Sequence, residues 1–205
     1  MTDITEENQP VVRPRIHSAE KKPLQDLLPM KTPISAHVDI SSICNYRCSF
    51  CFQADTKGMK EVGLKRGWME VDMFKKIVDG FKEFPDKIKK IKIGNHGEPT
   101  LHPNVAEMVK YARESNTADI IEMFTNGSRL EPKLNEAMVK AGLQRINISL
   151  EGLTDERYLQ VAGVKQNFQE IIDGVKSLYE IKTREKSDLQ IYVKIYFLNK
   201  KNINI

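Results

Sequence analysis

Apolar residues follow two different periods along this chain, and the two periods alternate from Ile34 onward. Short runs of β-branched residues, continuous or alternating with polar residues, are typical of strands. Longer stretches with apolar residues three or four positions apart are typical of helices. The pattern predicts strands over 34–40, 88–94, 119–124, 143–152 and 189–197, and helices over 71–81, 103–115, 131–142 and 164–182.

Three local signals refine these elements. Pro103 is predicted to occupy the first position of its helix, where the missing N–H costs no hydrogen bond. Gly142 is predicted to end the helix before it, because glycine readily takes the left-handed conformation that closes many helices. The run KIKKIK (87–92) interleaves lysine with isoleucine, and it predicts a half-buried strand with a solvated face.

Strands that alternate with helices predict an α/β protein with a parallel sheet. Such a sheet is either doubly wound or curled into a barrel, and in both cases the loops after the strands form the functional face. The unusual motifs of this chain follow predicted strands. We therefore expect them to meet at the carboxyl ends of the strands.

The first 33 residues differ from the rest, because they contain five of the nine prolines and few large apolar residues. This composition predicts an extended N-terminal arm over 1–33 and one folded domain over 34–205. The opening segment MTDITEENQP is acidic and polar, unlike a secretory signal, and no apolar run is long enough to predict a membrane span. The net charge of +4 does not indicate a nucleic-acid partner. We expect a cytoplasmic protein.

The three cysteines of the chain, Cys44, Cys48 and Cys51, all lie in CNYRCSFC, directly after the first predicted strand. Thiolates select zinc, copper(I) or iron–sulfur clusters. A structural zinc site needs four protein ligands, so zinc would require one of four scattered histidines, and this alternative stays open. A four-iron cluster normally takes four cysteines. With three, one iron keeps a position open for a bound ligand.

This C-x3-C-x2-C spacing, with the aromatic Phe50 before the last cysteine, resembles that of the radical S-adenosylmethionine (radical SAM) superfamily. The resemblance runs from about residue 34 to the end of the chain. It implies that Cys44, Cys48 and Cys51 bind a [4Fe–4S] cluster. It also implies a partial TIM-like (β/α) barrel of six βα units, of which about five can be counted, so that the barrel is expected to be truncated after its fifth strand.

The same resemblance suggests which residues contact S-adenosylmethionine. Members of the family carry Gly-Gly-Glu after the second strand, and this chain has GNHGEPTLHP (94–103), with His96 where the first glycine is usual. The TNG segment after the third strand and one face of INISLEG in the fourth are expected to face the cofactor. Two alternatives stay open: TNG as a plain turn, and Asn147 and Glu151 on a solvated strand face. A glycine-containing pattern in the fifth strand is not found in IYVKIYFLNKKN. The implied contacts are Phe50, Gly97, Glu98, Pro99, Asn126, Asn147, Ser149 and Glu151.

The resemblance implies a radical SAM enzyme. The reduced cluster would cleave S-adenosylmethionine to a 5′-deoxyadenosyl radical, which would abstract hydrogen from a peptide or a small molecule. A low-potential donor of the flavodoxin or ferredoxin type is the expected electron source, and oxygen sensitivity is expected. Relatives with a similar first half often continue into an accessory-cluster region, for which this chain has no cysteines. Two alternatives stay open: a non-catalytic iron–sulfur or zinc module, and a degenerate remnant that binds the cluster without turnover.

Overall fold

The computed structural model describes residues 23–195 and divides the chain into two compact units, 1–30 and 31–205. Within the first unit, residues Leu24–Leu27 form a single turn of 3₁₀ helix. Residues 1–22 lie outside the described part, so the extended arm over 1–33 stays a prediction.

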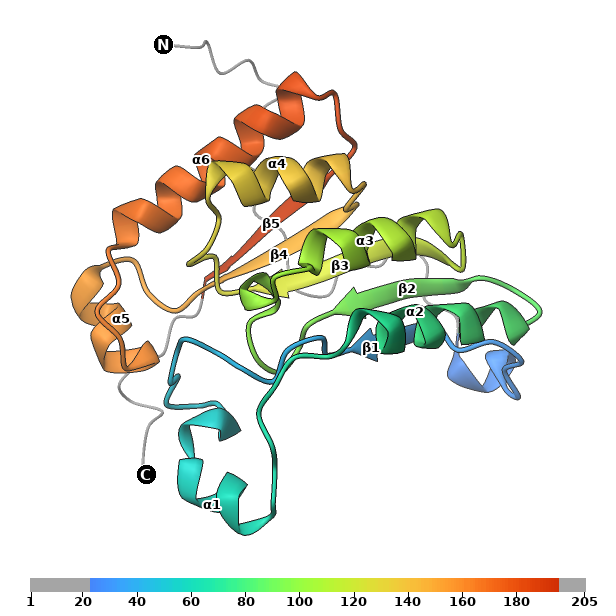
Figure 1. The fold of residues 1–205 in the computed structure, drawn as a ribbon, viewed down its shortest axis with the longest axis horizontal. Coiled ribbons are helices and arrows are strands. Elements are labelled where there is room, and N and C mark those ends of the chain that lie inside the picture. Colours follow the sequence, from blue (N-terminus) through green and yellow to red (C-terminus); the bar gives the residue numbers. More distant parts are fainter. Residues whose placement is uncertain (1–22, 196–205) are drawn as a thin grey trace. The chain divides into compact units, whose positions relative to one another are not determined.

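The second unit contains one sheet of five parallel strands in the order β1-β2-β3-β4-β5 (Figure 1). A doubly wound sheet reverses its strand order, whereas a barrel adds each new strand beside the last. The strictly sequential order therefore confirms the α/β, partial TIM-like barrel. Its strands are β1 Ser35–Val38, β2 Ile88–Ile93, β3 Ala118–Thr125, β4 Arg145–Leu150 and β5 Gln190–Ile195.

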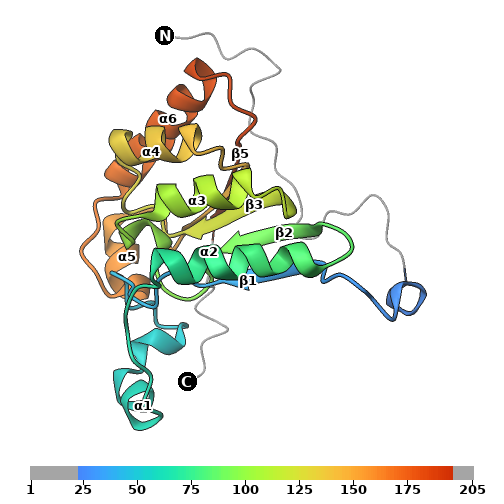
Figure 2. The same ribbon diagram turned by 45° about the vertical axis from the view of Figure 1, so that its right-hand side comes forward.

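Four helices cover one face of this sheet, as both ribbon views show (Figures 1 and 2). Strand side chains on the helix side are buried and apolar, for example Ile91, Met123 and Ile146. In β2 the isoleucines are buried and the lysines are partly or fully exposed, as predicted. The opposite, inner face carries a group of interacting polar residues, Lys90, Glu122 and Asn147. The covering helices are α2 Val71–Gly80, α3 Val105–Glu114, α4 Pro132–Lys140 and α6 Phe168–Arg184.

Two further helices lie beside the carboxyl ends of the strands (Figure 1), namely α1 Thr56–Glu61 and α5 Asp155–Ala162. The sequence pattern missed both, because they are short. It also began α6 four residues early: the structure starts this helix at Phe168, behind an Asn167 cap that accepts a hydrogen bond from the backbone N–H of Gln169.

The predicted role of Pro103 is wrong. A 3₁₀ turn over Pro99–Leu101 precedes α3, and Asn104 is the N-cap, so Pro103 lies just outside the helix. The prediction for Gly142 is confirmed, because this residue follows α4 with a φ of +80°. The fifth strand was predicted to reach residue 197; residues 196–205 lie outside the described part. None of the helices in the part that the structure describes is long and apolar enough to cross a membrane.

Candidate functional site

The cysteine loop (residues 44–51) is held in place by the end of α5. The backbone N–H of Arg47 donates to the carbonyl of Ala162 at 2.7 Å, and the N–H of Ser49 donates to the carbonyl of Val161 at 2.8 Å. The last carbonyls of a helix have no partner within the helix, so they are available to such donors. A helix that the sequence pattern missed therefore fixes the backbone between the three cysteines.

Tyr46 anchors the same loop in the protein core. Its side chain is only 2% exposed, and its hydroxyl donates to Oε1 of Gln166 at 3.0 Å. The ring packs edge-on against Tyr158, with centroids 5.9 Å apart. A buried tyrosine between polar neighbours explains how a loop of polar composition acquires a fixed conformation.

The three thiols are free and half-buried, and Phe50 beside them is half exposed. Burial raises the pKa of Cys44, and the backbone N–H of Tyr46 opposes this effect. Burial, followed by the negative charge of Glu151, raises the pKa of Cys48 to about 12. A thiol with a raised pKa stays protonated at neutral pH, so binding of a metal centre would have to displace the proton.

The turn over residues 94–99 packs directly on the segment that leads into the cysteine loop. The backbone N–H of Glu98 donates to the carbonyl of Ile43 at 2.8 Å. Gly97 has a φ of +85°, and a Cβ atom there would lie 2.2 Å from the carbonyl oxygen of Ser41. Only glycine fits this close approach. Pro99 is buried in the turn that follows.

The Glu98 carboxylate is 1% exposed, and it accepts hydrogen bonds from the protein itself. Its Oε1 accepts from the backbone N–H and the hydroxyl of Thr100 and from the hydroxyl of Thr125, at 3.0, 2.6 and 2.7 Å. Its Oε2 accepts from the backbone N–H of Asn126 at 2.7 Å. Burial raises the pKa of Glu98, and these donors oppose the rise. The side chain thus ties the turn after β2 to the turn after β3.

Asn126 in turn reaches the cysteine loop. Its side-chain Nδ2 donates to Oδ1 of Asn45 at 2.9 Å and lies 4.0 Å from Sγ of Cys44. The hydroxyl of Ser128 donates to Oδ1 of Asn126 and accepts from Nδ2 of Asn45. The structure therefore brings Asn126 to the first cysteine.

The fourth strand has the predicted two faces, because Ile146, Ile148 and Leu150 are buried and the alternate residues are less so. Glu151, just beyond the strand, is 5% exposed. Burial raises the pKa of its carboxyl group, and Lys194 opposes the rise. Its negative charge also contributes to the raised pKa of the Cys48 thiol.

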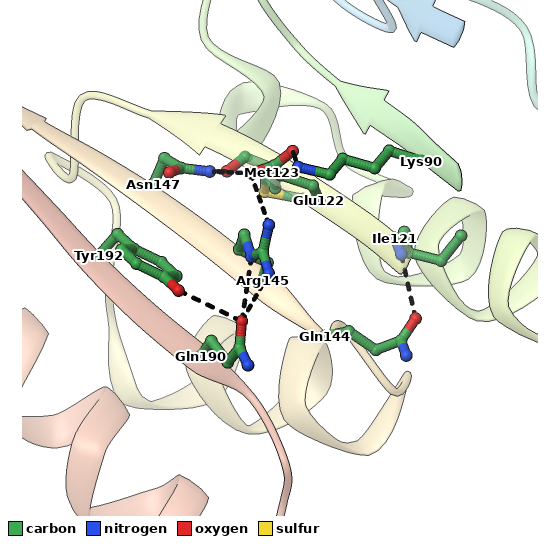
Figure 3. Close-up of polar contacts among 9 residues, drawn as sticks. All are labelled: Lys90, Ile121, Glu122, Met123, Gln144, Arg145, Asn147, Gln190 and Tyr192. Carbon is green, nitrogen blue, oxygen red and sulfur yellow. Dashed lines mark hydrogen bonds and ion pairs between the residues drawn. The ribbon is translucent and has the colours of Figure 1, made fainter. Parts of the chain in front are cut away.

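Asn147 belongs to a different set of contacts (Figure 3). Its Nδ2 donates to Oε1 of Glu122 at 2.9 Å. Lys90 and Arg145 flank the same carboxylate, each with a nitrogen 3.8 Å from one of its oxygens. This cluster lies on the inner face of the sheet, and the sequence pattern did not find it because its members come from three strands.

The three cysteines are a suitable donor set for a [4Fe–4S] cluster. They are free, half-buried and carried by one loop. In such a cluster each thiolate binds its own iron.

Comparison with known proteins agrees with this geometry. The model of the Radical SAM superfamily matches residues 38–202. The chain belongs to this superfamily. Radical SAM proteins use a [4Fe–4S] cluster and S-adenosylmethionine, and the relatives found here are enzymes.

Among curated relatives, a probable GTP 3′,8-cyclase of Thermococcus kodakarensis is 31% identical over 139 residues, which are 68% of this chain and 41% of that protein. A tungsten-containing aldehyde ferredoxin oxidoreductase cofactor-modifying protein of Pyrococcus furiosus is 31% identical over 117 residues, or 57% of this chain and 30% of that protein. The radical SAM chain thus spans less than half the length of these relatives.

Among solved structures, native anSMEcpe with bound AdoMet and Cp18Cys peptide is similar to this chain with a TM-score of 0.59 and 15% identity. The match covers 84% of this chain and 54% of that one. At this identity, the similarity supports the partial-barrel fold alone.

Proposed function

We propose that the chain is the catalytic barrel of a radical SAM enzyme, which cleaves S-adenosylmethionine reductively and abstracts hydrogen from a peptide or small-molecule substrate. The observation that carries this proposal is the cysteine loop. It presents three thiols, is fixed by α5 and Tyr46, and is joined through Asn126 and Glu98 to the turn after β2. An incomplete set of three thiolates leaves one iron open to a ligand.

In this proposal Cys44, Cys48 and Cys51 hold the cluster, which supplies the electron for cleavage of the sulfonium. The turn containing Gly97, Glu98 and Pro99 offers backbone groups to the methionine amino group. Glu98 contributes by orienting that turn, since its carboxylate is occupied by protein donors. The remaining proposed cofactor contacts are Phe50, Asn126, Asn147, Ser149 and Glu151.

The reaction needs an electron at low potential, because a sulfonium accepts one reluctantly and cluster potentials reach down to about −700 mV. We propose a flavodoxin or ferredoxin as the donor and the cytoplasm as the location. The domain over 34–205 would then be a partial barrel, with five strands in its described part.

Product analysis tests the proposal. The anaerobically reconstituted protein, reduced by dithionite, should convert S-adenosylmethionine to methionine and 5′-deoxyadenosine. Cys48→Ser should abolish both products, since one iron loses its ligand. Cluster incorporation without 5′-deoxyadenosine would instead identify a remnant that binds the cluster but has no turnover.

A further inference from the structure

The turn after β2 has an unusual side chain, because His96 stands where the superfamily commonly has a glycine. The structure shows where this side chain goes. Nδ1 of His96 lies 2.8 Å from Oδ2 of Asp39, the residue that follows β1. The His96 ring also packs edge-on against Phe52, with centroids 5.2 Å apart, one residue beyond Cys51. The imidazole therefore lies between the end of β1 and the cysteine loop.

Asp39 binds the backbone of the same turn as well. Its Oδ1 accepts from the N–H of Asn95 at 2.7 Å and from the N–H of His96 at 3.1 Å. One half-buried carboxylate thus receives three hydrogen bonds from two consecutive residues, two from backbone and one from the ring. Hydrogen bonds to an ionised acceptor are stronger than neutral ones.

These bonds act on Asn95 and His96, which lie between the contacts that Gly94 makes with Val38 and that Glu98 makes with Ile43. Gly94 and Gly97 flank the two residues, with φ values of +76° and +85°. Glycine on both sides gives the backbone many accessible conformations. Restricting the backbone to one of them costs conformational entropy. Asp39 selects one of them and fixes it relative to β1, which leads straight into the cysteine loop.

The carboxylate beside Nδ1 favours a proton on that nitrogen, because the Nδ1–H group can then donate a hydrogen bond to Oδ2 of Asp39. Nδ2 of Asn95 lies 3.4 Å from Nε2 on the other side of the ring. A glycine at this position would leave one of the three bonds to Asp39 unmade. The orientation of the His96 ring and the full set of hydrogen bonds to Asp39 therefore depend on each other.

We propose that Asp39 and His96 act as a pair of positioning residues, which hold the turn over 94–98 in the conformation that binds S-adenosylmethionine. This inference rests on the proposed function. Neither residue ligates the cluster, so the pair should affect cofactor affinity and leave cluster assembly unchanged. Partners of this indirect kind commonly change affinity by about 10- to 100-fold.

Binding of S-adenosylmethionine to the anaerobically reconstituted protein tests the pair. Asp39→Asn should weaken the affinity about tenfold while iron and sulfide content stays at the native level. His96→Gly should weaken it less, and in the His96→Gly background Asp39→Asn should cost less than in the native protein. His37→Gln is the matched control, an exposed histidine in β1 outside these contacts, and it should bind like the native protein.

Nitrogen NMR of the metal-free protein gives an independent readout. His96 should show the Nδ1–H tautomer in the native protein and lose it in Asp39→Asn. Native affinity in both Asp39→Asn and His96→Gly, or an Nε2–H tautomer in the native protein, would overturn this inference alone. Failure of the native protein itself to bind S-adenosylmethionine would overturn the proposed function and this inference with it.

Discussion

The backbone N–H of Asn126 donates to Oε2 of Glu98 at 2.7 Å, and this bond joins the turns after β2 and β3. The family resemblance implies that Glu98 contacts the cofactor. In the structure its carboxylate accepts hydrogen bonds from three protein residues, and Glu98 is 1% exposed. We therefore interpret Glu98 as a structural residue, whose loss would destabilise the turns after β2 and β3.

Replacement of Glu98 by alanine should strongly destabilise the protein. Four donors would lose their acceptor, and each buried donor left unsatisfied costs about 1–3 kcal/mol, partly offset because a buried charge is removed. We expect a net loss of about 2–4 kcal/mol in the free energy of unfolding, measured by urea denaturation. Glu107→Ala is the control, because this carboxylate is exposed and its ion pair with Lys75 lies at the surface. Equal losses in the free energy of unfolding for the two substitutions would contradict this structural role of Glu98.

Gly163 should be needed for the position of the cysteine loop. It follows α5 with a φ of +65°, and a Cβ there would lie 3.3 Å from both Cβ and the carbonyl oxygen of Arg47. Gly163→Ala should cost about 1–2 kcal/mol from backbone strain and should also speed amide hydrogen exchange at Arg47 and Ser49.

Gly63→Ala provides a matched control for this experiment. Gly63 has a φ of +70°, and a Cβ there would meet no atom within 4 Å. It should show the same strain without the faster exchange in the loop. Indistinguishable exchange in the two variants would show that α5 does not hold the cysteine loop.

Alkylation of the metal-free protein should reveal the environment of Cys48. Burial and the Glu151 charge raise the pKa of this thiol to about 12. The rate of its reaction with iodoacetamide should therefore still increase about tenfold per pH unit between about pH 8 and about pH 10. Glu151→Gln should speed the reaction at a given pH, since it removes a charge that disfavours the thiolate. Peptide mass spectrometry would measure the extent of alkylation at Cys48 over time. A rate that levels off near pH 9 would contradict the raised pKa.

Asn147 and Ser149 should separate into two roles, although both were predicted to face the cofactor. Asn147→Ala removes the donor at 2.9 Å from the buried Glu122 carboxylate, and it should lower stability by about 1–3 kcal/mol. Ser149→Ala should leave the thermal midpoint nearly unchanged and should weaken S-adenosylmethionine binding more than Asn147→Ala does. The reverse ranking in a binding titration would place Asn147, and not Ser149, at the cofactor.

Much of the fold is encoded in local periodicity. The alternation in β2 and β4 fixes which side chains face the helices, and the sequential βα pattern fixes the parallel sheet. Short helices such as α1 and α5 lack enough turns to show a period. The exact start of α3 depended on a 3₁₀ turn that Glu98 stabilises through Thr100, which is a tertiary effect of a buried side chain.

Only those site residues could be predicted that the spacing of residues along the sequence or the family resemblance indicates. Three cysteines in one loop could be found by counting. The partners that orient them could not, because Tyr46 meets Gln166 and Asn45 meets Ser128 across 120 and 83 residues of sequence. The contact between Asp39 and His96 likewise spans 57 residues and follows from the pairing of β1 with β2.

The most direct test of the central claim is the electron paramagnetic resonance spectrum of the reduced protein, reconstituted anaerobically with iron and sulfide. We predict the signal of a reduced four-iron cluster that changes when S-adenosylmethionine is added, because the cofactor occupies the iron that Cys44, Cys48 and Cys51 leave open. A cluster signal that is the same with and without S-adenosylmethionine, or a purified protein that holds zinc, would contradict the account.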